Sequence, residues 1–312
     1  MGCLSLFRKE RQATTHPSNM SKQFTLSDWN DIPVVVGLGV DNIDLDEKKL
    51  LKFPAFNGWQ KTLRENLERQ KRPGQVYSTD PWRLEKVMIH HVTLFGENIG
   101  FMTIEAFLRK GDGQALENRL DRVIFLRGGS VAVLMILRPK DNRNERYVIL
   151  TDQPRLGACS TTFLEIPAGM LDEETRNIKG KAIQEIEEET NLQVRADELI
   201  NLTELALRQS KAVEDLQQAI YMSPANLDEF IPLLLWEKEL DRKDIMSMRS
   251  QLGGERTQGE LITIRVTEYD TLWREGARDA KTLSAWALYE GLNRTGVIEK
   301  ELQRIRSVNF DK

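Results

Sequence analysis

The segment LEIPAGMLDEETRNIKGKAIQEIEEETNL, from Leu164 to Leu192, decides the fold of this chain. It opens as a short apolar strand, turns at Pro167-Ala168-Gly169, and becomes helical at about Gly180 after a ten-residue loop. The helix is indicated by residues at three- and four-residue intervals that form one inward stripe: Ala182, Ile183, Ile186 and Thr190. The segment therefore predicts a strand, a turn and a helix that packs by one face.

The opposite face of this helix is acidic. Glu185, Glu188 and Glu189 fall at i, i+3 and i+4, so their carboxylates gather on one side. Like charges at this spacing cost about 0.2–0.5 kcal/mol per pair, and near a helix C-terminus they also oppose the macrodipole. An acidic run is most often a solvated helix face. A hard divalent cation such as Mg²⁺ would offset the repulsion, so a metal site is the alternative interpretation.

The glycine before the loop favours the metal site. Gly169 ends a strand, where the lack of a side chain lets the backbone approach a ligand and can turn a carbonyl toward a metal. The whole segment resembles the Nudix box, whose pattern is Gly, five residues, Glu, seven residues, then Arg-Glu-apolar-any-Glu-Glu-any-Gly-apolar. The tail of that pattern corresponds here to QEIEEETNL, from Gln184 to Leu192, and its core carboxylates match.

Three departures from the box pattern bear on the metal site. Gln184 replaces the arginine, Asn191 replaces the last glycine, and the loop is one residue longer, which leaves Glu173 or Glu174 to stand for the first glutamate. Asparagine tolerates the left-handed C-cap conformation almost as glycine does, so the second departure is mild.

The first departure removes a charge. The resemblance implies that the box arginine braces the acidic cluster, and Gln184 cannot do so as a cation. Metal affinity or rate therefore depends on whether Arg176, Lys179 or Lys181 takes its place.

Composition indicates an ordinary globular protein of 312 residues, with 40% hydrophobic and 29% charged residues. A net charge of -4 and a pI near 5.7 give no basic footprint, which argues against nucleic acid as a partner. The two cysteines, Cys3 and Cys159, exclude a disulfide framework and suit a reducing, cytoplasmic compartment. No apolar run reaches the ~18–20 residues of a transmembrane segment.

The first residues, MGCLSLFRKERQ, bear on whether the protein is cytoplasmic or attached to a membrane. Gly2 and Cys3 suggest an N-terminal lipid anchor, but the serine falls at Ser5, one position short of the acylation pattern. A disordered leader, or translation from Met20, explains these residues at least as well, and an organellar leader is a further alternative.

The N-terminal part is expected to hold a disordered leader over residues 1–30 and a helical and antiparallel-sheet region over residues 31–127. Helical spacing over residues 46–70 indicates two helices divided by Pro54 and Gly58. The runs WRLEKVMIHHVTLF and NIGFMTIEAFLR, separated by Gly96-Glu97-Asn98, predict a hairpin, and RVIFLRG predicts another strand.

Residues 128–312 are expected to form the main domain. VAVLMIL pairs with RYVILT across a charged turn, and FLEI, QAIYM, FIPLLLWEK and GELITIRVTEY continue the sheet. DAKTLSAWALYEGLNR predicts a helix. The fold class is α+β, a mixed sheet between helices preceded by a smaller N-terminal antiparallel sheet and helices.

Beyond the box, residues 90–295 resemble the ADP-sugar diphosphatase and ADP-ribose pyrophosphatase branch of the Nudix hydrolases. The segments that carry this resemblance are LFGENIGFMTIEAF, VIFLRGGSVAVLMIL, YVILTDQPR, LEIPAGMLD and TEYDTLWREGARDAKTLSAWALYE. It implies a Nudix α/β/α sandwich, a homodimer, Mg²⁺ or Mn²⁺, and hydrolysis of ADP-sugars to AMP and a sugar 1-phosphate. It also implies substrate binding by Arg127 and Arg155, although either could be an ordinary ion-pairing arginine.

The same resemblance implies the roles at the metal. Glu185 and Glu189 are the expected principal ligands, with Glu188 beside them as ligand and catalytic residue and the Ala168 carbonyl as a neutral ligand. A late mobile loop is expected to supply the catalytic base. Glu260 is the first choice, followed by Glu255 and then Glu229.

Two alternatives remain open on the sequence alone. The substrate could be ADP-ribose or another nucleoside diphosphate derivative, with the chemistry unchanged. Alternatively, the loss of the arginine at Gln184 could indicate a catalytically weakened, nucleotide-binding module.

Overall fold

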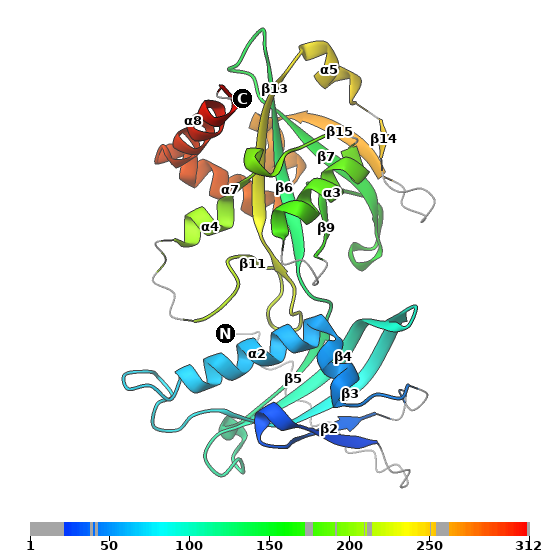
Figure 1. Cartoon of the computed structure of the whole chain (residues 1–312), viewed down its shortest axis with the longest axis vertical. Helices are drawn as coiled ribbons and strands as arrows, with labels where there is room; N and C mark the ends of the chain where they lie inside the picture. The colour runs from blue at the N-terminus through cyan, green and yellow to red at the C-terminus, as the bar shows by residue number, and fades with distance from the viewer. Residues whose placement is uncertain are drawn as a thin grey trace.

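The computed structural model describes residues 22–37, 40, 43–171, 177–190, 192–208, 210, 214–249, 251–253 and 262–310. Two lobes, each built on a sheet, follow one another along the chain (Figure 1). The chain passes from the first sheet to the second at Arg127-Gly128-Gly129. Within the described part, none of the helices is long and apolar enough to cross a membrane.

The N-terminal sheet has five strands in the order β1-β2-β3-β4-β5. They are β1 (Gln23–Leu26), β2 (Ile32–Val36), β3 (Arg83–Phe95), β4 (Asn98–Arg109) and β5 (Arg119–Leu126). The predicted hairpin is confirmed as β3 and β4, and its turn contains Gly96 at φ 62°. The expectation of an antiparallel sheet is wrong for one pair, because β2 and β3 are parallel. A helical crossover joins these two strands, which is the connection a parallel pair needs.

The first strand lies inside the range expected to lack structure. β1 begins at Gln23 and pairs with β2, so the predicted leader over residues 1–30 is wrong for its last part. The physical reason is alternation: Leu26 is only 1% exposed and joins the core, while Gln23 is exposed. Residues 1–21 lie outside the described part of the chain.

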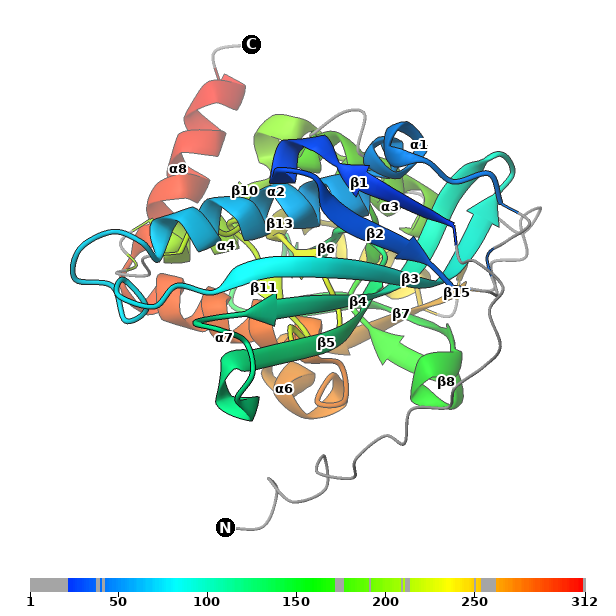
Figure 2. The ribbon, with the colours of Figure 1, turned by 90° about the horizontal axis from the view of Figure 1, so that it is seen from below.

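The crossover consists of α1 (Glu47–Lys52) and α2 (Pro54–Arg69). Pro54 divides the two helices as predicted, because proline fits the first turn of a helix and not its interior. Gly58 does not interrupt α2. Ala55 and Phe56 of α2 pack against the N-terminal sheet, and the helix lies between that sheet and the larger lobe (Figures 1 and 2).

The larger sheet has eight strands and is mixed. Its main order is β10-β13-β6-β7-β15-β14, with β8 paired to β7 and β9 paired to β6, and only the pair β13 and β6 is parallel among these. The strands are β6 (Ser130–Pro139), β7 (Tyr147–Arg155), β8 (Ser160–Glu165), β9 (Ala168–Met170), β10 (Ile200–Asn201), β13 (Leu233–Leu240), β14 (Leu252–Gly253) and β15 (Ile262–Glu268).

Strand β6 explains why helices cover both faces of this sheet. Its residues are buried on both sides: Val131 and Val133 face one core, while Ala132 and Leu134 face the other. The first core is closed by α3 (Ile178–Thr190) and α5 (Arg242–Ser247), and the second by α4 (Leu202–Leu207), α6 (Leu272–Glu275), α7 (Ala280–Arg294) and α8 (Val297–Phe310) (Figure 1). The expected α/β/α sandwich is confirmed.

Two details differ from the sequence-based expectations. QAIYM does not continue the sheet, because β11 (Ile220–Tyr221) pairs only with β12 (Phe230–Ile231) in a separate two-stranded sheet. Pro232 separates β12 from β13, since proline cannot donate to a strand ladder. The C-terminal helix α8 was not predicted, although Ile298 and Leu302 are buried at helical spacing.

Candidate active site

Helix α3 brings its acidic face against strand β9. A Cβ atom built on Gly169 would lie 1.8 Å from Cδ of Glu185, so the carboxylate rests directly on the glycine backbone. Ala168 is the preceding residue of the same strand, next to this contact. The glycine therefore makes room for a carboxylate of the protein itself beside the backbone, at the position where the sequence predicted close approach of a ligand.

Glu189 lies one turn further along α3 and is 4% exposed. The Gln153 side chain donates a hydrogen bond of 3.4 Å to its Oε1. Its Oε2 is buried without a hydrogen-bond partner among the residues that the structure describes. Burial raises the pKa of Glu189 well above its ordinary value, and the nearby charges of Glu185 and Glu165 raise it further.

Glu165, at the end of β8, is the third carboxylate and is 2% exposed. Two cations hold it. Arg155 approaches Glu165 Oε1 at 2.5 Å through Nη2, and Lys281 Nζ pairs with Oε2. Lys281 also lies 3.1 Å from Asp279 Oδ1. We refer to Glu165, Glu185 and Glu189 as the carboxylate cluster.

Two elements position the cations around Glu165. Gln153 and Arg155 both come from the end of β7, where the register with β8 shifts between them, and they bind Glu189 and Glu165 respectively. Lys281 stands in the first turn of α7, where the side chain of Asp279 caps the helix by accepting from the Thr282 backbone N–H at 3.1 Å. The Thr282 hydroxyl in turn accepts from Ile166 N–H at 3.0 Å, which ties α7 to the segment after Glu165.

The position of the missing box arginine is occupied by a short network. Gln184 donates to Glu188 Oε1 at 2.7 Å, and Lys181 pairs with Glu185 Oε1 at 2.8 Å. Of the expected replacements for the arginine, Lys181 is thus placed against a cluster carboxylate. Lys179 instead donates to the backbone carbonyl of Leu199 at 2.7 Å. Glu188 is half-buried and bound to Gln184.

Arg127 lies at the junction of the two sheets. Its Nη1 is 2.9 Å from Glu229 Oε1, and the Ser130 hydroxyl donates to the same oxygen at 2.8 Å. Its backbone N–H donates to Asp228 Oδ1 at 2.8 Å. Its Nε is buried without a hydrogen-bond partner in the described part of the chain. Glu229, the third choice for the base, is therefore engaged in an ion pair.

Both preferred bases, Glu260 and Glu255, lie outside the described residues, as do Glu173, Glu174, Arg176 and Asn191. The strand that leads toward Glu255 is placed, however. A Cβ atom built on Gly253 would lie 1.8 Å from the backbone oxygen of Glu189, so β14 packs directly against the end of α3.

The cluster suits a hard divalent cation. Across the described residues, no three histidine, cysteine or acidic side chains converge into a complete metal site. Mg²⁺ does not need one, because it is commonly held by one or two carboxylates together with waters and substrate phosphates. The buried, unpartnered Oε2 of Glu189 and the carboxylate pressed on Gly169 are the features such an ion would use.

The sequence did not identify Glu165, Gln153 or Lys281 as parts of this site. The signal for Glu165 was present, because a glutamate ends the strand FLEI directly before the Pro-Ala-Gly turn. Lys281 comes from a helix 116 residues later in the chain, and no local pattern connects the two.

Comparison with known proteins shows the family to which this chain belongs. The chain is 30% identical over 285 residues to "Nudix hydrolase 14, chloroplastic" of Arabidopsis thaliana, an alignment that covers 91% of this chain and 85% of that protein. A solved structure described as an ADP compounds hydrolase shares 17% identity at a TM-score of 0.41 and covers 69% of this chain and 98% of its own. No protein-family profile matches. The chain belongs to the Nudix hydrolase family.

Proposed function

We propose that this Nudix hydrolase cleaves the pyrophosphate bond of an ADP-sugar, giving AMP and a sugar 1-phosphate, with Mg²⁺ or Mn²⁺ as cofactor. One observation carries the proposal: Glu185 rests on Gly169, and Glu189, one turn further along α3 and only 4% exposed, has an oxygen without a partner among the described residues. A divalent cation would satisfy that oxygen and offset the repulsion within the cluster.

The proposed metal ligands are Glu185, Glu189 and the Ala168 carbonyl, with Glu188 beside them. The bound cation would neutralise phosphate charge and make water more acidic. Glu165 is held in place by its ion pairs with Arg155 and Lys281. Lys181 holds Glu185 in place, which is the role that the uncharged Gln184 cannot fill.

Hydrolysis consumes one water per substrate. The oxygen of water adds to one phosphorus, the bridging P–O bond breaks, and the bridging oxygen leaves with the other phosphate. A base must take a proton from the water. We assign this role to Glu260 ahead of Glu255, because Glu260 directly precedes the alternating run LITIRVTEY in the sequence; Glu229 is already paired with Arg127.

Arg155 and Arg127 are the proposed phosphate contacts. Arg155 remains 41% exposed although it is bound to Glu165, and Arg127 remains 28% exposed although it is bound to Glu229. A guanidinium can hold a carboxylate with one edge and offer its other N–H groups to a phosphate.

The test is turnover of a panel of nucleoside diphosphate compounds by the purified protein with Mg²⁺ or Mn²⁺, with AMP release as the readout. ADP-glucose should be cleaved faster than ADP-ribose, and Glu189→Gln should remove the activity. Equal activity of the variant, or no AMP from any compound, would reject the catalytic proposal.

The alternative substrates remain separable by the same panel. Comparable or faster cleavage of ADP-ribose would assign the chain to ADP-ribose or a related nucleoside diphosphate derivative. A nucleotide-binding module without catalysis would bind AMP and release none from any compound.

We also infer that the active form is a homodimer. The tip of the β3 and β4 hairpin supports this, since Phe95 is 52% exposed and stacks edge-on to Phe101 at 5.0 Å. Exposed aromatic side chains of this kind are typical of protein interfaces. Light scattering on the protein after size-exclusion chromatography should give twice the 35.9 kDa chain mass. The mass of a monomer would reject the inference.

A further inference from the structure

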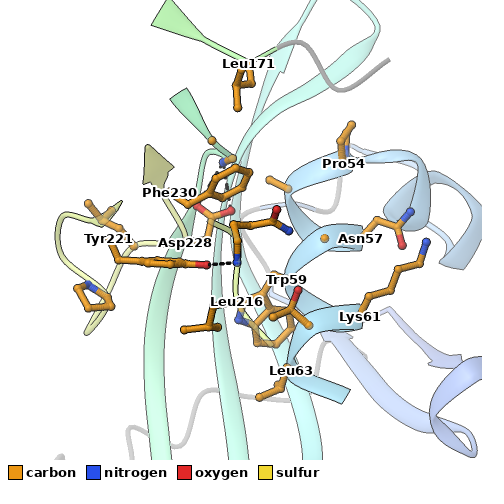
Figure 3. A pocket seen from close by; sticks show the side chains of 18 of the residues that line it. Pro54, Asn57, Trp59, Lys61, Leu63, Leu171, Leu216, Tyr221, Asp228 and Phe230 are labelled. Carbon is orange, nitrogen blue, oxygen red and sulfur yellow. Dashed lines mark hydrogen bonds between the residues drawn. The ribbon is translucent and has the colours of Figure 1, made fainter. Parts of the chain in front are cut away.

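A cavity of about 920 Å³ lies between α2 and the segment around β11 and β12 (Figure 3). Three aromatic side chains line it: Trp59 from α2, Tyr221 from β11 and Phe230 from β12. The ring of Phe230 lies against the backbone of Gly129, where a Cβ atom would be only 2.6 Å from it. We call this space the α2 cavity. Its size falls within the range of small-molecule sites.

The polar groups of the α2 cavity do not suit a diphosphate. Lys61 is accompanied by two acids, Glu214 and Asp228, and there is no arginine among the described residues that line the space. Burial raises the pKa of Asp228, whose carboxylate already accepts the backbone N–H groups of Arg127 and Gly128. Aromatic surfaces with neutral amides such as Asn57 suit an uncharged, planar ring.

Gly58 gives an independent indication that this space is kept open. It lies in the interior of α2, lines the cavity, and a Cβ atom built on it would meet nothing within 4 Å. Glycine weakens a helix interior relative to alanine, and here no neighbouring atom requires it. Gly58 is exposed and lines the α2 cavity, so a long side chain at this position would reduce the room in which a ring could lie.

The α2 cavity is connected to the carboxylate cluster through two segments. Leu171 lines the cavity two residues after Gly169, and Ile178, at the start of α3, lines it as well. Glu185 follows Ile178 by seven residues, which is about 10 Å along a helix. A nucleotide with its diphosphate at the cluster would have to span about this distance to place its base in the cavity.

We propose that the α2 cavity binds the nucleobase of the substrate, a planar heteroaromatic ring, with Gly58 as the point of closest approach to α2. The proposal deepens the proposed function and rests on it for the identity of the ligand. The N-terminal lobe then sets base selectivity, while the larger lobe carries out the hydrolysis.

The test uses Gly58→Gln, which fills the cavity, with Gly291→Gln as the matched control. Gly291 is also inside a helix, α7, also has nothing within 4 Å, and is not a lining residue. Both substitutions should raise the melting temperature slightly, by about 2 °C, because glutamine is the better helix former.

The readout is equilibrium binding of AMP to the full chain without metal, followed by steady-state turnover. Gly58→Gln should weaken AMP binding at least about tenfold and raise KM with kcat nearly unchanged, as expected for lost stacking. Tyr221→Leu should weaken AMP binding by a similar factor. Gly291→Gln should keep the affinity within about twofold.

The outcomes separate this proposal from the proposed function. Weaker AMP binding in Gly58→Gln supports the base site even if no compound is hydrolysed. Unchanged AMP binding, no AMP binding by the unaltered protein, or weakened binding of glucose 1-phosphate with intact AMP binding would overturn it. The last result would place the sugar in the α2 cavity.

Discussion

The carboxylate cluster is tightly packed and rich in negative charge, whereas the α2 cavity is open and is lined mostly by uncharged residues. In the cluster, Glu185 rests on Gly169 and an oxygen of Glu189 is left unpartnered among the described residues. In the cavity, Gly58 faces empty space. Gly169 thus makes room for the Glu185 side chain, whereas Gly58 leaves room for a bound ligand. Helix α3 contributes to both regions, because Ile178 lines the cavity and Glu185 and Glu189 belong to the cluster.

The largest expected effect separates the two regions. Glu189→Gln should lower metal-dependent turnover about 10³-fold, because a lost carboxylate ligand removes several kcal/mol of transition-state stabilisation. AMP binding without metal should stay within about twofold, since the α2 cavity is untouched. Turnover assays and equilibrium binding on the same preparation check this. Loss of both properties together would show that the cluster and the cavity are not separate regions.

A second change alters the cluster through its backbone. Gly169→Ala should lower turnover about 10–100-fold, because the new methyl group displaces the Glu185 carboxylate, a flexible group that can move. The melting temperature should change little. The control is Gly253→Ala, where the new atom meets the backbone oxygen of Glu189 instead. That variant should lose about 1–3 kcal/mol of unfolding free energy. Equal losses of stability in Gly169→Ala and Gly253→Ala would contradict the expectation that only the Gly169 site has a movable neighbour.

A third expectation concerns stability without metal. The pKa of Glu189 is raised in the folded protein, so its contribution to stability is present below the unfolded pKa, about 4.3, and is lost as pH rises through the folded pKa. Glu189→Gln should therefore be the more stable protein near pH 8 with EDTA, by about 1–3 kcal/mol.

Thermal unfolding from about pH 5 to about pH 8 measures this difference, which should grow with pH. Added Mg²⁺ should stabilise the unaltered protein and not the variant. A difference that shrinks as pH rises would contradict the assigned burial of this carboxylate.

The smallest expected effect is that of Gln184→Arg. Lys181 already pairs with Glu185, so the arginine of the box pattern should change turnover less than about fivefold. Steady-state kinetics with the leading substrate measure the change. A gain of more than tenfold would show that Lys181 does not replace the arginine.

Local patterns in the sequence predicted much of the fold. The apolar run of β6 indicated a strand, and the glycine at 96 indicated the turn between β3 and β4. The helix α7 was predicted as well. The parallel pairing of β2 with β3 was not, because it depends on how the α1 and α2 crossover returns the chain to the sheet.

The site was predicted only where it is local. The i and i+4 spacing placed Glu185 and Glu189 on one face of α3, and the glycine at 169 indicated a close approach. Glu165 and Lys281 meet across 116 residues, so their pairing appears only after the chain has folded. Gly58 was interpreted as a helix breaker, because its empty surroundings are a tertiary property.

The single passage of the chain between its two sheets, at Arg127-Gly128-Gly129, has a thermodynamic consequence. Gly128 adopts φ 81°, and both glycines line the α2 cavity together with α2 on the other side. A molecule bound there contacts both lobes at once, so its binding free energy adds to the work of separating them. Amide hydrogens at the junction should then exchange more slowly when a ligand occupies the cavity. Hydrogen exchange at the junction therefore measures ligand binding.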